Sequence, residues 1–379
     1  MKEQDISLLR ARLTVLTRSI RRMTIPMDRA LNLPQSAKDD YVSYENRTLK
    51  RKRIVLLAPA CMAATCTMCP LPNEALDLKR RSISPADIIQ QFDSSFDGVS
   101  LDDYEMITVY NNGNFFADQE INPIVRQHIF KQVARSSASV LMVESLPQFI
   151  TPARISDVKK HLGDKELAVG IGLQSSNDLV RELAVNSTCT KANFEKAAST
   201  LRENNYTPLT FLMIKPPFLT EREAVGDTVE SISYLASLGI ENPILCPTRI
   251  APNTIGQLLF ENGQFKPPWL WSVAEVLKIS SRKNPSSMPR VVTSELRPEA
   301  NLDSVCPKNC SMCTQTFIGI FESYNKSHNT QGLEGMSCDC QADYKAYVSL
   351  EDSEIGTLSI SDRVERFLNE RLGEIPLRS

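Results

Sequence analysis

Short apolar runs alternate with longer stretches of helical period between about residues 54 and 280 of this chain. Alternation of strand and helix predicts an α/β fold, a parallel β-sheet that carries its helices on the outside. Six strand–helix units predict an open or partial (β/α)6 barrel, smaller than a closed barrel of eight units. The expected strands are 54–57, 106–110, 140–144, 167–173, 209–215 and 242–246. The expected helices between them are 83–92, 123–134, 155–161, 193–202 and 221–238.

The same pattern divides the chain into three parts: a basic N-terminal helical extension (1–53), the partial barrel (54–285) and a small Cys-rich metal-binding segment with a terminal helix (286–379). In the extension, Lys and Arg outnumber Asp and Glu by roughly two to one, and leucines interleave with the arginines as in an amphipathic helix. The run Lys-Arg-Lys-Arg at 50–53 leads into the first strand. A phosphate-bearing partner and a merely solvated helix face explain this charge equally well, and the sequence leaves both open.

Composition excludes several classes of protein. With 379 residues and 42% hydrophobic content, the chain can bury a full core. A formal net charge of −2 and a pI near 6.1 argue against a protein that coats nucleic acid by bulk charge. No run of about 18 apolar residues occurs, and the polar N-terminus has no apolar signal region, so we expect a cytoplasmic protein without a membrane span.

Ten cysteines in a chain of this kind predict metal ligands rather than disulfides. Cys61, Cys66 and Cys69 lie within nine residues, directly after the first expected strand. Thiolates this close on a loop can face one metal centre, and groups of this kind hold iron–sulfur clusters. A zinc half-site or three unrelated core cysteines would be the alternatives.

A second group of cysteines lies near the C-terminus. Cys310, Cys313, Cys338 and Cys340 supply four thiolates, enough for a closed tetrahedral zinc site. Cys306 is a further candidate ligand, and with it the group could hold an auxiliary iron–sulfur cluster instead. The sequence does not separate the two metals, and a four-thiolate structural site is the favoured interpretation.

Polar residues follow five of the expected strands. In parallel α/β sheets, binding and catalytic residues gather at the carboxyl ends of the strands. The first strand runs into the cysteine triplet and the second into the Asn-rich loop 111–114; Glu144, Gln174 and Lys215 end the next three. Together these strand ends predict a single site around the triplet.

At these residues the chain resembles the radical S-adenosylmethionine enzymes. The triplet spaces its cysteines by four and two residues, where the usual spacing is three and two. The run 169–178 and the residues 179–183 after it look like the fourth-strand signature of the branch that contains Elongator-type, coproporphyrinogen-oxidase-like and methylthiotransferase enzymes. Within that branch, the stretches 215–224 and 267–272 and the C-terminal cysteines are similar to the radical subunits of the archaeosine synthase type.

The resemblance implies two ligand sets for one cofactor pair. Cys61, Cys66 and Cys69 would hold a [4Fe–4S] cluster, and the amino and carboxylate groups of S-adenosylmethionine would chelate its fourth iron. The loop at Gly113 and Asn114 would receive the methionine amino group, where a close approach of backbone to ligand suits glycine. The family usually carries Glu or Ser in this loop, so the Asn-rich version departs from its pattern.

The resemblance also implies contacts to the rest of the nucleotide. Glu144 would accept hydrogen bonds from the ribose hydroxyls. Gln174 would contact the ribose or the carboxylate, and Lys215 would pair with that carboxylate. A solvated lysine at a strand end is the plain alternative for Lys215, although the two prolines after it stiffen the turn.

An enzyme of this type would cleave S-adenosylmethionine reductively to a 5′-deoxyadenosyl radical, which would abstract hydrogen from the substrate. It would need an electron donor such as flavodoxin or ferredoxin. The archaeosine-type resemblance implies a modified base of transfer RNA as substrate. A tailoring enzyme acting on a small molecule is the competing hypothesis, and a non-catalytic metal-binding scaffold is a third.

Overall fold

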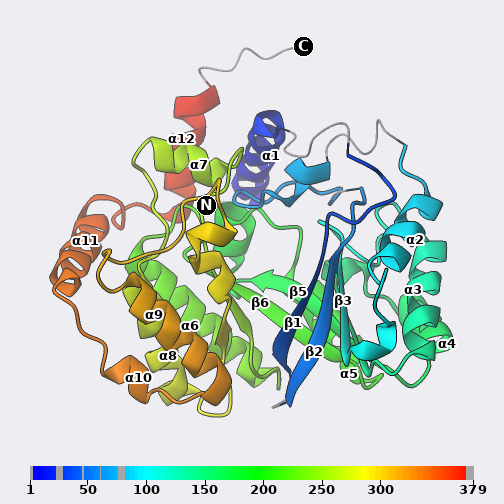
Figure 1. Ribbon diagram of the computed structural model, residues 1–379. Coiled ribbons are helices and arrows are strands. Elements are labelled where there is room, and N and C mark those ends of the chain that lie inside the picture. The colour runs from blue at the N-terminus through cyan, green and yellow to red at the C-terminus, as the bar shows by residue number, and fades with distance from the viewer. Residues whose placement is uncertain (1–2, 23–28, 45–46, 60, 76–81, 373–379) are drawn as a thin grey trace.

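The computed structural model describes residues 3–22, 29–44, 47–59, 61–75 and 82–372. One sheet of eight strands, in the order β1 to β8, forms the centre of the molecule (Figure 1). The strand β1 is antiparallel to β2, and every later neighbour pair is parallel. The predicted α/β fold with a parallel sheet is therefore confirmed.

The six expected strands correspond to β2 to β7, and the sheet gains one strand at each edge. The strands are β1 (Ser36–Tyr44), β2 (Arg47–Val55), β3 (Met106–Tyr110), β4 (Val140–Glu144), β5 (Glu166–Gln174), β6 (Thr207–Ile214), β7 (Ile244–Pro247) and β8 (Arg290–Val291). The segment boundary expected at residue 53 falls inside β2, because the hairpin β1–β2 joins the sheet.

Helices cover the outer face of the sheet (Figure 1). They are α2 (Pro85–Ser94), α3 (Pro123–Arg135), α4 (Pro152–Leu162), α5 (Lys191–Arg202), α6 (Glu221–Ser237) and α8 (Leu270–Lys283). The short helix α7 (Ile255–Glu261) lies instead with the terminal helices. The helices α2, α3 and α4 each begin with proline after a capping Ser, Asn or Thr side chain. These caps fix where each helix starts, and with it the short loop that leaves each strand.

The two faces of the sheet bury different clusters, because side chains alternate along a strand. On β3, Ile107 and Val109 belong to the large core beneath the helices. Met106 belongs to a smaller cluster on the concave face. The buried members of that cluster are Tyr44, Leu49, Met106, Val140, Met142 and Ala168. The concave face is thus apolar near the amino ends of the strands.

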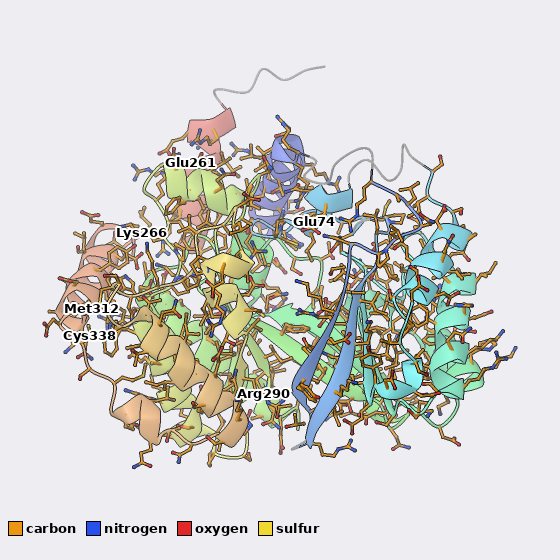
Figure 2. The ribbon with its side chains drawn as sticks, in the orientation of Figure 1. Glu74, Glu261, Lys266, Arg290, Met312 and Cys338 are labelled. Atoms are coloured by element: carbon orange, nitrogen blue, oxygen red, sulfur yellow. The ribbon has the colours of Figure 1, made fainter. Side chains whose placement is uncertain are left out.

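The two edges of the sheet approach each other at one end. A guanidinium N–H of Arg290 on β8 donates to the backbone carbonyl of Ser43 on β1. Figure 2 shows Arg290 at the lower end of the sheet, beside β1. This contact curls the sheet into a half-barrel that is drawn together at that end.

The two terminal helices pack against each other beyond the carboxyl end of the sheet (Figure 1). They are α1 (Glu3–Ile20) and α12 (Ile360–Leu372). They share an apolar cluster with α7 that includes Leu13 and Phe367. The predicted amphipathic N-terminal helix and the predicted terminal helix are both present, while the side chain of Leu372 and residues 373–379 lie outside the described part of the chain.

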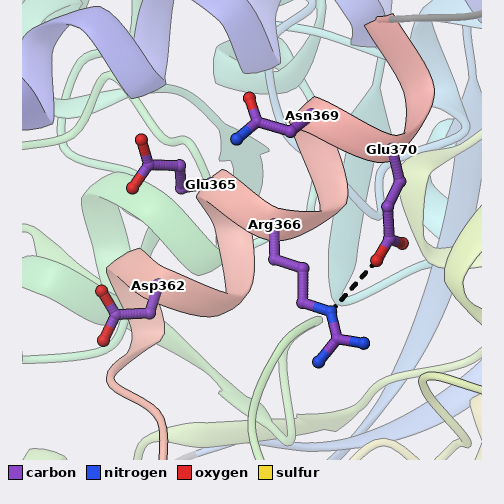
Figure 3. Close-up of a pocket in the computed structure, with 5 residues that line it drawn as sticks. All are labelled: Asp362, Glu365, Arg366, Asn369 and Glu370. Carbon is purple, nitrogen blue, oxygen red and sulfur yellow. Dashed lines mark hydrogen bonds and ion pairs between the residues drawn. The ribbon is translucent and has the colours of Figure 1, made fainter.

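The outer side of α12 carries a shallow surface hollow (Figure 3). All its lining residues come from this one helix: Asp362, Glu365, Arg366, Asn369 and Glu370. Its one drawn interaction is the pair Arg366–Glu370 at 3.1 Å, four residues apart on the helix. Such a hollow is an ordinary solvated helix face.

The C-terminal segment adds three further helices, α9 (Thr314–Ser327), α10 (Gln331–Glu334) and α11 (Cys340–Glu354), which lie against α6 and α8. Within the residues that the structure describes, no helix combines the length and the apolar character needed to span a bilayer.

Candidate metal centres and active-site mouth

Four of the C-terminal cysteines converge on one point. The sulfur atoms of Cys310, Cys313, Cys338 and Cys340 all lie within 4.8 Å of one another. Three of the Sγ–Sγ distances are 3.6 Å. A tetrahedral ion with Zn–S bonds of about 2.3 Å sets its thiolates about 3.8 Å apart. The spacing therefore fits one tetrahedral ion better than a cluster of several atoms.

Local structure prepares these thiols for a metal. Cys313 immediately precedes α9 and Cys340 begins α11, so the ion would join the starts of two helices. Backbone N–H groups, chiefly that of Cys313, lower the pKa of Cys310 to about 7. Cys306 is buried but is not a member of the converging set. Figure 2 shows Cys338 at the outer edge of the molecule, beside α11.

The N-terminal triplet lies on the loop that follows β2. Burial, followed by the neighbouring thiols of Cys69 and Cys61, raises the pKa of Cys66. Burial also raises the pKa of Cys69, to about 11. Coordination to a metal deprotonates a thiol outright and would offset these raised pKa values. Among the described residues, the set of converging thiols does not include these three.

The loop after β3 touches the triplet loop directly. The backbone N–H of Cys61 donates to the carbonyl of Asn112 at 3.3 Å. A Cβ on Gly113 would lie 2.8 Å from the nitrogen of Cys61 and 2.1 Å from Oε2 of Glu120. Such contacts do not occur between real atoms, so this close approach requires glycine. This packing within the protein is a reason for glycine at position 113 that the sequence argument did not give, and the prediction that Gly113 lies close to a ligand stays a prediction.

Glu120 is a site residue that the sequence argument missed. Its carboxylate is buried and accepts hydrogen bonds from the Nδ2 of Asn114 at 2.9 Å and from the backbone N–H of Met62 at 3.0 Å. The Nδ2 of Asn114 also lies 3.7 Å from the sulfur of Cys61. One carboxylate thereby ties the Asn-rich loop to the cysteine loop. The available signal was a second carboxylate, beside Asp118, in the segment between β3 and α3.

Glu144 lies where β4 ends on the concave face. Burial raises the pKa of its carboxyl to about 7. Its charge acts on Tyr110 of β3 and Cys246 of β7, whose pKa values are raised chiefly by their own burial. The end of β4 thus carries a carboxyl group whose neutral form burial favours, which suits a residue that binds a ligand in the half-barrel. Its assignment to the ribose hydroxyls stays a prediction.

Gln174 ends β5 at an irregularity. Its backbone has a positive φ of 69°, and the register against β6 shifts between Gly172 and Gln174. A Cβ on Gly172 would lie 2.3 Å from the Nε2 of Gln174, so the amide folds back over this glycine. The bulge re-aims the side chain at the strand end, as bulges near sites commonly do.

Lys215 has a different role in the structure from the one that the resemblance implied. Its side chain is fully buried, and its ammonium lies 2.8 Å from Glu221 and 3.0 Å from Glu351. A buried ammonium needs counter-charges, and here two protein carboxylates supply them. We therefore assign Lys215 to holding α11 against the end of β6 rather than to the carboxylate of a bound nucleotide.

Two further residues near the triplet escaped the sequence argument. Arg249, after β7, acts electrostatically on the thiol of Cys69 and forms an ion pair with Glu295. Asn111, at the end of β3, is buried, and neither polar atom of its side chain has a partner among the described residues. A buried unpaired amide commonly marks an ordered water or a ligand. No sequence signal separates Asn111 from the other three residues of its loop.

No family model matches the chain. A protein of Methanosarcina acetivorans named archaeosine synthase subunit beta is 27% identical over 300 residues, which cover 78% of this chain and 83% of that protein. A protein of the same name from Thermococcus kodakarensis is 26% identical over 282 residues, 73% of this chain and 83% of that protein. An uncharacterized protein of Methanocaldococcus jannaschii is 26% identical over 312 residues, 81% of this chain and 84% of that protein.

Among solved structures, the Elp3 of Methanocaldococcus infernus matches with a TM-score of 0.44 and 15% identity, covering 69% of this chain and 62% of that one. The resemblance to archaeosine synthase subunits that the sequence motifs predicted is confirmed by the named relatives.

Proposed function

We propose that this chain is a radical S-adenosylmethionine enzyme whose substrate is a modified base of transfer RNA. Two relatives that align with most of the chain carry the name archaeosine synthase subunit beta. The observation that carries the proposal is the contact between the triplet loop and the Asn-rich loop, made by Cys61 and Asn112 across the close approach of Gly113. It joins three clustered thiols to the strand end at which a ligand would meet them.

The residues present fit the two groups that the proposal requires. Cys61, Cys66 and Cys69 would hold the [4Fe–4S] cluster, and the mouth around Gly113 and Glu144 would receive S-adenosylmethionine. When bound, this pair would supply the carbon radical that removes hydrogen from an unreactive C–H bond. The electron that splits the sulfonium would come, through the cluster, from a reducing partner such as flavodoxin or ferredoxin.

The chain's own residues bind, orient and exclude water. Glu120 fixes the backbone around Met62 and Asn114 through hydrogen bonds. The neutral form of the Glu144 carboxyl is favoured by burial, so near neutral pH it can donate as well as accept a hydrogen bond to a hydroxyl. An apolar cluster that includes Met142 lies on the same concave face.

One observation favours the competing small-molecule substrate. Three cations of the basic run at 50–53 are already paired on the β-hairpin: Arg51 and Arg53 with Asp40 at 2.7 and 3.8 Å, and Lys52 with Asp39 at 2.9 Å. Paired cations contribute less to phosphate binding than free ones. A tailoring enzyme for a small molecule therefore stays the second candidate.

The test is anaerobic reconstitution with iron and sulfide, followed by S-adenosylmethionine and dithionite. The wild-type chain should produce 5′-deoxyadenosine, and Cys66→Ala should produce none. Cys189→Ala is the matched control, because Cys189 is a buried cysteine outside the triplet whose thiol bonds the carbonyl of Thr190, and its loss should leave production intact. Equal production by Cys66→Ala and wild type would remove the proposal.

Deuterium transfer into 5′-deoxyadenosine then separates the two candidate substrates. Precursor-modified transfer RNA, labelled at the modified base, is compared with the free labelled base, and unmodified transfer RNA serves as the blank. Transfer only from the RNA supports the first candidate, and transfer only from the free base supports the second.

A further inference from the structure

The segment between the first two cysteines of the triplet is one residue longer than the usual spacing. Ala64 within it has a positive φ of 49°, a conformation that residues with a Cβ rarely adopt. Such a segment needs support from outside to keep one shape. Asn186 donates to the carbonyl of Thr65 at 3.1 Å. The carbonyls of Ala63 and Ala64 are bonded by Arg18 of the N-terminal helix α1 and by Arg21, which follows that helix.

Arg21 spans both halves of the triplet loop. Its Nε and Nη2 donate to the carbonyl of Ala64 at 3.2 and 3.1 Å, and its Nη1 donates to the carbonyl of Cys69 at 3.0 Å. Arg18, one turn earlier, donates to the carbonyl of Ala63 at 2.8 Å. The planar fork of a guanidinium makes this double grip, which a lysine ammonium cannot reproduce.

The charge of Arg21 has no carboxylate to balance it. Its side chain is buried, with 6% of the residue exposed, and in the described part of the chain it forms no ion pair with Asp or Glu. Burial lowers the pKa of its guanidinium, while Cys69, Cys66 and Cys61, in that order, oppose the shift. A buried cation needs a counter-anion. Among the described residues, these three thiols are the acidic groups that act most strongly on its charge.

We infer that Arg21 is a positioning residue of the cluster centre, which fixes the longer cysteine segment through its carbonyls and balances the negative charge of the ligated thiolates. The inference rests on the proposed function, because it takes the triplet to hold a cluster. It makes the basic N-terminal helix a part of the metal centre, where the sequence suggested a phosphate-binding or solvated face.

Two substitutions separate the hydrogen bonds of Arg21 from its charge. Arg21→Gln removes both, and Arg21→Lys keeps the charge without the fork. Arg22→Gln is the matched control, because Arg22 is exposed and bonds only carbonyls of its own segment, those of Ser19 and Arg21. The readouts are iron and sulfide bound per chain after reconstitution, the reduction potential of the cluster, and zinc retained at Cys310, Cys313, Cys338 and Cys340 as a check of folding.

Arg21→Gln should weaken iron binding by about tenfold, the usual effect of losing a residue that orients metal ligands. Its residual cluster should also have a more negative reduction potential, because a nearby cation favours the reduced, more negative cluster. Arg21→Lys should keep a potential close to wild type and still bind iron weakly. Arg22→Gln should match wild type in both.

Wild-type iron content and potential in a zinc-loaded Arg21→Gln protein would overturn the inference and leave the proposed function standing. A wild-type chain that takes up no iron through the triplet would overturn both. If Arg21→Gln fails to retain zinc, Arg21→Lys provides the test. An Arg21→Lys protein that keeps its zinc and binds iron as tightly as wild type would overturn the role of the guanidinium hydrogen bonds. One that keeps its zinc and binds iron more weakly would support that role.

Discussion

Gly170 on β5 is the register partner of Glu144 on β4, and a methyl group on Gly170 would lie 2.9 Å from the Cγ of Glu144. The same methyl would lie 2.6 Å from the ring of Phe211 on β6. Three neighbouring strands thus depend on one missing side chain to place a carboxyl group on the concave face. The glycine before the bulge at Gln174 is therefore part of the site although it offers no functional group.

Gly170→Ala should disturb the site more than the fold. Overpacking a tight position costs about 1–3 kcal/mol and displaces the neighbours, here Glu144 and Phe211. We expect a chain that retains zinc and iron but produces much less 5′-deoxyadenosine. Gly226→Ala in α6 is the control, because no atom lies within 4 Å of its added methyl, and it should stabilise by about 0.5–1 kcal/mol. Equal activity of the two variants would contradict this role of Gly170.

The stability of the chain should fall with rising pH because of Glu144. Burial raises its pKa to about 7. A carboxyl that binds its proton more tightly when folded stabilises fully below its unfolded pKa of about 4.3, and the contribution is lost as pH rises through 7. The loss is on the order of 3 kcal/mol. Urea unfolding at about pH 5 and about pH 8 measures this loss as a difference in unfolding free energy. Glu144→Gln should remove the difference, whereas Glu203→Gln on the exposed surface should leave it unchanged.

The parts of the fold that sequence predicted well are those with local signals. The strands β3 and β4 have the expected bounds, because a polar residue stands directly before and directly after each apolar run. The strand β8 has two residues, Arg290 and Val291, too few to carry any pattern. The strand β1 is rich in polar and charged residues and lies in the sheet through pairs such as Asp39–Lys52, which only its partner strand explains.

The residues of the site likewise fall into those with a local sequence signal and those without one. The C-terminal cysteines were predictable because metal ligands have recognisable spacing, and four of them do converge. The roles of the triplet and of Gly113 stay predictions. Glu120 and Arg21 act through bonds to backbone groups of a distant loop, and such bonds leave no pattern in the chain. Lys215 shows the converse: a cation at a strand end looked like a ligand contact, but its partner Glu351 lies far along the chain.

Removing the charge of Lys215 should destabilise the chain strongly. Lys215→Met would leave the carboxylates of Glu221 and Glu351 buried without their cation, an arrangement that costs about 3–5 kcal/mol. Burial already raises the pKa of Glu221. Chemical unfolding measures the loss. Arg222→Ala breaks the exposed pair with Asp352 between the same two helices and should change stability little. A loss no larger than that control would assign Lys215 to another role.

Metal removal should act first on the C-terminal segment. Cys338→Ser or a strong chelator takes one ligand or the ion from the four-thiol site, which joins the starts of α9 and α11. Binding energy at such sites is folding energy, so we expect loss of about one zinc per chain and rapid proteolysis after about residue 306, with the barrel intact.

Cys306→Ala should keep its zinc, because Cys306 is outside the converging set. Iron instead of zinc in protein purified without oxygen, or zinc loss from Cys306→Ala, would contradict the assignment. Because Glu351 on α11 also neutralises Lys215, chelation should weaken that buried ion pair as well, and the two losses should be less than additive.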